Sequence, residues 1–410
     1  MLAVFLNIDL KQTLSRHSLE AIFPLIATMK IAILNTWFRL RRNVFSGKHA
    51  LIVTVIFALF LPVSPTFAAS SGFSSARVSA VPDSPSYFIT SSKLPKEVYV
   101  ADFGHNYGPD LDLVAEGNLS VINGSTNKVI QTIGVGSEPY GGAYDPQNKE
   151  LYIVDYGDLY SSSVTVINST TNKVIKTIVS SAGSQAISAA YDSHNHDVYV
   201  ANFGNDTVSV INTSNNKVFA TFHVGPNSFG GGPSAIIFNP HNDELYATGG
   251  LDTNAIYVIS DSNNSVIKTI TDPGSFPYPL AEGLNPSNDE LYVANFGDND
   301  VAVINCRTNT VLTTVPVGDA PDGVGFDASN RDMYVSNYVG ASVSVINMKN
   351  SVIKTISVGT GPSLPGYDPQ NKEMYVPNWA TDTVSVIDSN TNKVVATIAV
   401  GTGPIGIVIS

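Results

Sequence analysis

The chain has 410 residues, a formal net charge of −12 and a single cysteine, Cys306. One cysteine excludes a fold held together by internal disulfides, so side-chain packing must stabilise the protein. Residues 1–69 hold seven of the 22 basic residues and two of the 34 acidic ones, which leaves 15 against 32 and a formal charge of −17 for the rest. Such a surface repels phosphate backbones, which excludes nucleic acid as an expected partner.

Residues 1–69 are predicted to be a leader that contains a signal peptide. A basic segment (39–48) precedes an apolar run (51–61), and small residues follow it. This order is typical of an export signal, and we expect cleavage after Ala68 or Ala69. The alternative is an uncleaved anchor, the only way in which we expect the chain to contact a membrane. The apolar run is shorter than the ~20 residues that a spanning helix needs, which favours cleavage.

Two further features flank this signal. Met29 suits a start codon better than Met1, because export signals rarely carry so long an upstream arm. Residues 70–96 are rich in Ser and Pro and show no sustained alternation, which predicts a linker.

From residue 97 to residue 410 the sequence repeats a unit of four short strands. Each unit begins with a strand that contains a tyrosine, and three more runs of β-branched residues follow, bounded by Gly, Asn, Asp or Pro. Successive tyrosines lie 41 to 53 residues apart, which is the length of a propeller blade. The seven tyrosines are Tyr99, Tyr152, Tyr199, Tyr246, Tyr292, Tyr334 and Tyr375.

This pattern predicts an all-β fold, a seven-bladed β-propeller of four-stranded antiparallel blades. In Leu291-Tyr292-Val293-Ala294 both the odd and the even residues are apolar, which indicates a sheet that is covered on both faces. The C-terminal segment 404–410 is a fourth strand without a unit of its own, so we expect it to complete blade one beside residues 98–100 and to close the ring. Residues 87–90 are the alternative partner for that strand.

The repeats resemble those of the YVTN family of β-propellers. Tyr334-Val335-Ser336-Asn337, Val384-Ser385-Val386-Ile387-Asp388 and Thr397-Ile398-Ala399-Val400-Gly401 carry the resemblance, which spans residues 97–410. Because that family occurs in exported and surface-layer proteins, the resemblance implies a secreted or cell-surface protein. It implies the fold and says little about activity.

Two carboxylates are the candidate site residues of the predicted axial channel. Aligning the fourth strands places Glu282 and Asp322 on adjacent blades, at positions that we expect to face the axis. Two such carboxylates could bind Ca²⁺ or another divalent cation, or act as an acid and a base. The alternative, which we favour at this point, is that channel water solvates both of them.

Other polar residues are weaker candidates for a site. Asp102 and Asp155 replace the Asn that ends the tyrosine strand in later repeats, and we expect turn-forming carboxylates there rather than cation ligands. His194, His196 and His241 could bind a transition metal together. Equivalent turns of neighbouring blades usually stand too far apart, so exposed turns are expected.

Blade one also contains an acidic insertion, and several glycosylation sequons follow the leader. Asp110, Asp112 and Glu116 could bind extracellular Ca²⁺ weakly, although they lack the glycine and the spacing of a known calcium loop. The Asn-x-Ser/Thr sequons are candidate glycosylation sites at Asn118, Asn123, Asn168, Asn205, Asn212 and Asn263.

The sequence carries no motif of a known catalytic class, so we identify no catalytic residue and expect no resident cofactor. It favours an exported binding scaffold whose blade loops contact an extracellular protein or glycan. The alternative is a lactonase-like or lyase-like hydrolase that holds a divalent metal at Glu282 and Asp322. A subunit of a surface array is the third hypothesis.

Overall fold

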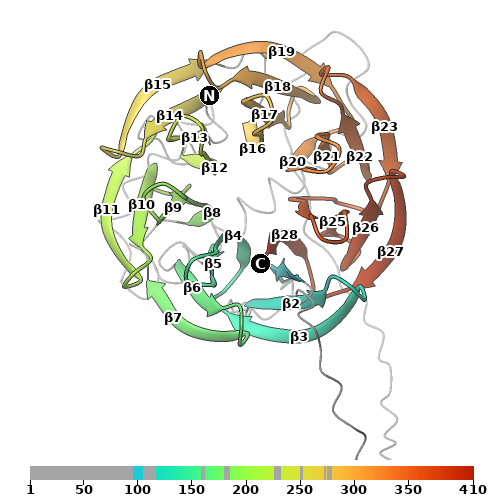
Figure 1. The fold of residues 1–410 in the computed structure, drawn as a ribbon, viewed down its shortest axis with the longest axis horizontal. Helices are drawn as coiled ribbons and strands as arrows, with labels where there is room; N and C mark the ends of the chain where they lie inside the picture. Colours follow the sequence, from blue (N-terminus) through green and yellow to red (C-terminus); the bar gives the residue numbers. More distant parts are fainter. Residues whose placement is uncertain are drawn as a thin grey trace, which may run out of the picture. The chain divides into compact units, whose positions relative to one another are not determined.

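The computed structural model describes residues 96–104, 117–157, 162–179, 185–225, 232–249, 253–271, 274 and 279–410. In these ranges 28 strands form seven antiparallel sheets of four strands each. The sheets are arranged as blades around one axis, which confirms the predicted seven-bladed propeller (Figure 1). Within the same ranges no helix has both the length and the apolar character needed to cross a membrane.

The strands of each blade follow one another from the axis outward. Blade one consists of β28 (Pro404–Ile409), β1 (Glu97–Asp102), β2 (Gly117–Asn123) and β3 (Lys128–Val135). Blade two has β4 (Pro139–Asp145), β5 (Glu150–Asp155), β6 (Ser163–Asn168) and β7 (Lys173–Val179), and blade three has β8 (Ala186–Tyr191), β9 (Asp197–Asn202), β10 (Thr207–Asn212) and β11 (Lys217–His223). Blade four has β12 (Pro233–Asn239), β13 (Glu244–Gly249), β14 (Ala255–Ser260) and β15 (Ser265–Thr271). Blade five has β16 (Pro279–Asn285), β17 (Glu290–Asn295), β18 (Asp300–Asn305) and β19 (Thr310–Pro316). Blade six has β20 (Pro321–Phe326), β21 (Met333–Asn337), β22 (Ser342–Ile346) and β23 (Val352–Ser357), and blade seven has β24 (Gly366–Asp368), β25 (Glu373–Asn378), β26 (Thr383–Asp388) and β27 (Lys393–Ala399).

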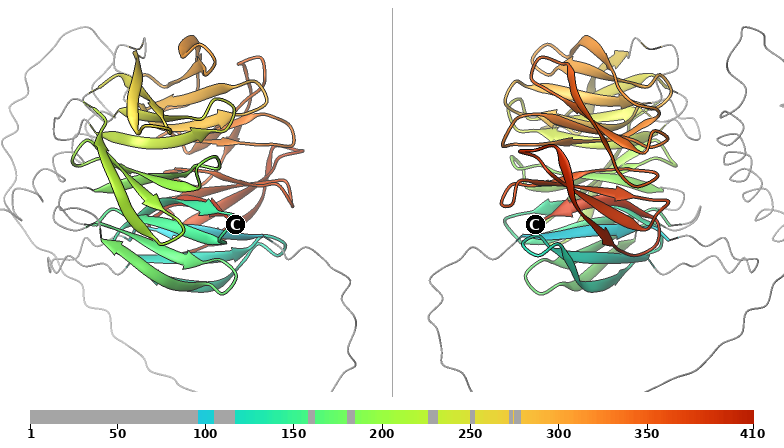
Figure 2. Two further views of the ribbon diagram at one scale, coloured as in Figure 1. Left: turned by 60° about the vertical axis from the view of Figure 1, so that its left-hand side comes forward. Right: turned by 90° about the vertical axis from the view of Figure 1, so that its right-hand side faces the viewer.

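The hydrophobic core lies between the blades. Tyr246 and Val258 of blade four pack against Leu291 and Val293 of blade five, and all four are fully buried. Each sheet therefore buries both faces against its neighbours, as the side views show (Figure 2). This explains why the second strand of each blade is apolar at successive positions instead of alternating.

A ring of hydrogen bonds joins each blade to the next. The hydroxyl of each strand tyrosine donates to the Oδ1 of an asparagine in the next blade, over 2.5–2.9 Å. The acceptors have φ between 51° and 56°, a left-handed conformation that Asn tolerates well. They are Asn172, Asn216, Asn264, Asn309, Asn350, Asn392 and Asn127. The last bond runs from Tyr375 of blade seven to Asn127 of blade one, so the ring of bonds is closed.

The C-terminal strand closes the sheet of blade one, as the sequence predicts. β28 pairs antiparallel with β1, with Val100 opposite Ile407 and Val98 opposite Ile409. Val98 and Val100 of β1 also pack against Tyr375, so blade one contacts blade seven. The other predicted partner, residues 87–90, lies outside the described residues.

Candidate functional site

Five of the inner strands each have one unpaired residue whose side chain lines the axial pocket. In β4, β8, β12, β16 and β20 the pairing register shifts at the second residue, as a β-bulge does. The residues at these five positions are Tyr140, Ile187, Ser234, Leu280 and Asp322, and all of them line one axial pocket. In blade three this residue is Ile187. Local alternation in the sequence does not reveal such a bulge.

The axial pocket has walls from all seven blades and a volume of about 190 Å³. Glu282 of blade five and Asp322 of blade six both line it, so the structure places these two predicted residues in one cavity. A cavity of ~150 Å³ accommodates benzene. The axial pocket therefore has room for a single small ring.

Glu282 is a buried carboxyl group without a protein partner. Both of its side-chain oxygens are inaccessible to solvent, and neither has a hydrogen-bond partner. The expected solvation by channel water therefore does not hold for this residue. Burial raises the pKa of Glu282 well above its usual range, which favours the protonated form of this carboxyl group.

Asp322 occupies a different environment in the same pocket. Its Oδ2 accepts a hydrogen bond of 2.6 Å from the Ser363 hydroxyl. Burial raises the pKa of Asp322 to about 7, and the bond from Ser363 opposes part of that rise. The pocket thus combines a carboxyl group whose protonated form is favoured by burial with one whose pKa lies near 7, a pairing typical of acid and base roles.

Aromatic residues surround one end of this pocket. Phe103 and Tyr156 each follow the tyrosine strand of their blade, and their rings lie 6.1 and 6.4 Å from the ring of pocket-lining Tyr140. Tyr338 and Trp379 follow the tyrosine strands of blades six and seven, and their rings lie 6.5 Å apart. The backbone N–H groups of Tyr156, Tyr338 and Trp379 donate to carbonyls just before the inner strands, which holds them at this end of the blades. We call these five residues the aromatic rim.

Sequence reasoning missed the aromatic rim, although a signal for it exists. An aromatic residue directly follows the tyrosine strand in six of the seven repeats, at Phe103, Tyr156, Phe203, Phe296, Tyr338 and Trp379. That regularity was available from the sequence, but only the closed ring shows that such residues gather around one pocket.

Asp102 and Asp155 form hydrogen bonds within their own blades, as expected for turn-forming carboxylates. Asp102 accepts a bond of 2.7 Å from Ser120, and Asp155 accepts bonds of 2.7 Å from both Ser163 and Thr165. In each carboxylate Oδ1 is buried without a partner. Burial raises the pKa of both groups to about 7.

The raised pKa of Asp155 predicts a pH-dependent gain in stability for Asp155→Asn. The unfolded chain loses this proton near pH 4, whereas the folded chain holds it up to about pH 7, so the free energy of unfolding falls as pH rises between those values. We expect the variant to be more stable than wild type by about 1–3 kcal/mol at pH 8 and equal to it near pH 4. At the equivalent position, Asn202 donates through its Nδ2 to the hydroxyls of Thr207 and Ser209, so an asparagine fits this site with the hydrogen-bond direction reversed.

Urea unfolding at both pH values measures this difference. Asp319→Asn is the matched control, because it makes the same substitution at an exposed position. Equal stability of the Asp155 variant and wild type at pH 8 would contradict the prediction.

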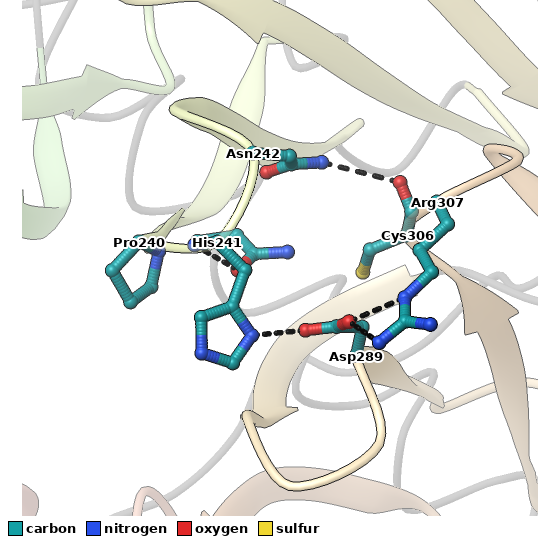
Figure 3. A pocket seen from close by; sticks show the side chains of 7 residues that line it. Pro240, His241, Asn242, Asp289, Cys306 and Arg307 are labelled. Carbon is teal, nitrogen blue, oxygen red and sulfur yellow. Dashed lines mark hydrogen bonds and ion pairs between the residues drawn. The ribbon is translucent and has the colours of Figure 1, made fainter.

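A second cavity lies at the junction of blades four and five and has balanced charges. It measures about 470 Å³ and is lined by the turns around His241 and Arg307, which both contact Asp289 (Figure 3). Burial raises the pKa of the Cys306 thiol in its wall to about 12, so that sulfur is no nucleophile at neutral pH. This cavity therefore has the character of a structural junction between blades four and five.

The other candidate residues are not brought together in one site. The three histidines are separate: His194 contacts Asp261, His196 contacts Tyr191, and His241 contacts Asp289. Asp110, Asp112 and Glu116 lie outside the described residues. Of the sequon asparagines, Asn118 and Asn263 are exposed and the other four are half-buried.

The fold and the axial pocket define a seven-bladed propeller with two unlike carboxyl groups on its axis. A model of the family described as Lactonase, 7-bladed beta-propeller matches residues 67–350, and the chain belongs to this family. No curated protein matches the sequence.

Solved structures with a similar fold have low sequence identity to the chain. A functionally unknown protein from Desulfotomaculum acetoxidans has a TM-score of 0.62 and 14% identity, with 77% of this chain and 98% of that chain covered. A protein from Lactobacillus plantarum has the same TM-score and 17% identity, with 77% and 99% covered. A streptogramin B lyase has a TM-score of 0.56 and 15% identity, with 65% and 86% covered. At these identities the likeness concerns the fold alone.

Proposed function

We propose that the chain is a hydrolase that opens a small cyclic ester in the axial pocket. The observation that supports this most directly is the pair of carboxyl groups, one neutral and unpartnered and the other ionising near neutral pH. The family description supplies the reaction class, and the volume of about 190 Å³ limits the substrate to one ring.

Asp322 would act as the general base of the reaction and Glu282 as the general acid. Ionised Asp322 takes a proton from a water molecule as its oxygen attacks the ester carbonyl carbon. The ring C–O bond then breaks, and Glu282 gives its proton to the leaving ring oxygen. The product is an open hydroxy acid, and transfer of the proton from Asp322 back to Glu282 inside the pocket completes the cycle.

A divalent metal between the same two residues is the alternative form of this proposal. It would require Glu282 to ionise in its buried position, which the cation itself must drive. Only one group of three His, Cys, Asp or Glu side chains in the described ranges has ligand atoms within 4.8 Å of one another, and it includes neither axial carboxyl. We therefore favour acid–base catalysis by the side chains, and metal analysis of the purified protein distinguishes the two forms.

Hydrolysis of a panel of five- and six-membered lactones by the purified protein tests the proposal. We expect kcat/KM to rise with pH through about 7, as Asp322 ionises, and to fall at higher pH when Glu282 loses its proton. Asp322→Asn should remove the rise of kcat/KM with pH together with most of the activity. Asp319→Asn should retain both the rise and the activity. A wild-type protein that opens none of these lactones would overturn the assignment.

The aromatic rim favours a second candidate function, an exported binding scaffold. Aromatic rings at a pocket entrance offer large, rigid faces for a glycan or a protein side chain. The YVTN-type repeats and the signal-like leader support export to the cell surface or the medium. Recovery of the protein outside cells, with its N-terminus near residue 69, checks this.

A further inference from the structure

A histidine of blade three meets two aspartates of blade four at the ends of the blades opposite the aromatic rim. His194 lies in the β8–β9 turn, Asp243 in the β12–β13 turn and Asp261 in the β14–β15 turn. The Nδ1 of His194 is 2.8 Å from Asp261 Oδ2 and 3.9 Å from Asp243 Oδ1. Asp261 is buried, whereas the side chains of His194 and Asp243 are 59% and 49% exposed. The two exposed side chains can rotate, and the buried one is held in place.

A third carboxylate lies beneath this cluster. Asp192 is fully buried, and its Oδ1 accepts backbone hydrogen bonds from His194 and Asn195 at 2.7 and 3.3 Å. Its Oδ2 is buried without a partner, and its charge acts on both His194 and Asp261. Three carboxylates thus surround one imidazole. Among the described residues, no Lys or Arg forms an ion pair with any of the three.

The next blade junction shows the same arrangement with its charges balanced. His241 takes the place of His194 and Asp289 the place of Asp243, but here the guanidinium of Arg307 contacts Asp289 at 2.6 Å. Figure 3 shows His241 and Arg307 approaching that carboxylate from two sides. The junction between blades three and four has two more carboxylates at its turns, Asp192 and Asp261, and no Lys or Arg of the described residues forms an ion pair there.

We propose that His194, Asp243 and Asp261 bind a divalent first-row transition metal ion, with Zn²⁺ as the best-matched member. Zn²⁺ takes His nitrogen and Asp oxygen at ~2.0–2.2 Å, which in tetrahedral geometry separates ligand atoms by about 3.4 Å. The distances from His194 Nδ1 to Asp261 Oδ2 and to Asp243 Oδ1 are 2.8 and 3.9 Å, one shorter and one longer than that separation. A nitrogen ligand disfavours Ca²⁺ and Mg²⁺.

The bound ion would link blades three and four. It would supply the positive charge that Arg307 supplies at the next junction. Three protein ligands also leave one position for water or an outside ligand. The site is separate from the axial pocket and does not depend on the proposed hydrolase activity.

Titration calorimetry of the chelator-treated full-length protein with ZnCl₂ tests the site. We expect one equivalent to bind, and we expect His194→Ala and Asp243→Asn each to weaken binding more than about tenfold, since even changes to groups around metal ligands cost that much. Both residues are exposed, so both variants should fold as wild type does. The visible spectrum of the Co²⁺-loaded protein reports the coordination number independently.

His241→Ala is the matched control, because it removes the equivalent histidine from the charge-balanced junction. Its Zn²⁺ affinity should equal that of wild type. The proposal is overturned if wild type binds no stoichiometric Zn²⁺, if the His194 and Asp243 variants bind as tightly as wild type, or if His241→Ala abolishes binding.

Discussion

A chain that ends at residue 403, without β28, is expected not to fold cooperatively. β28 pairs with β1 along its length and places Ile405 and Val408 in nearly buried positions. Burying each such side chain contributes roughly 1.5–3 kcal/mol and each paired hydrogen bond about 0.5–1.5 kcal/mol. Their sum, on the order of 5–10 kcal/mol, is comparable to the whole stability of a typical domain. Circular dichroism during thermal unfolding, and the retention volume on gel filtration, measure the effect.

Removal of Ser410 alone is the control for this truncation. Ser410 follows β28, and its backbone N–H and its hydroxyl both donate to the Glu97 carbonyl, over 3.2 and 3.5 Å. We therefore expect the melting temperature of this variant to match that of wild type. If the chain ending at residue 403 also melts as wild type does, the ring does not depend on its C-terminal strand.

Glu282→Gln is expected to lower kcat/KM for a lactone substrate by about 10²–10⁴-fold, the usual contribution of a general acid. Glutamine has nearly the same shape as the neutral acid and carries no charge, so the fold should not change. The variant also removes the group whose deprotonation limits activity at high pH, so the falling limb of the pH profile should disappear. Steady-state kinetics between pH 5 and pH 10 measure both effects.

The stability of the Glu282→Gln variant distinguishes a catalytic role of Glu282 from a purely structural one. Wild-type Glu282 favours the protonated form when folded, so the free energy of unfolding falls as pH rises above the pKa of the unfolded chain. Glu282→Gln should therefore be at least as stable as wild type at pH 8. Unchanged kcat/KM in a stable variant would show that Glu282 takes no part in the reaction.

The sequence alone was sufficient to predict the number of blades, the four strands in each and closure of the ring by the C-terminal strand. These features follow from local signals, namely a tyrosine in every unit, turn residues between strands and one strand left over at the end. It also placed Glu282 and Asp322 on neighbouring inner strands, because both lie in the fourth run of their repeats, two residues apart in the alignment.

Only the tertiary structure decided what those residues can do. The bulge in β20 directs Asp322 toward the axis. Burial raises the pKa of both carboxyl groups, and the hydrogen bond from Ser363 limits the rise only at Asp322. In the same way, the approach of Asp243 and Asp261 to His194 arises from blade packing between turns that are distant in the sequence. The charge state of a side chain and the geometry of its ligands depend on what surrounds it in space. The repeat pattern encodes each blade, but it does not encode which groups neighbouring blades bring together.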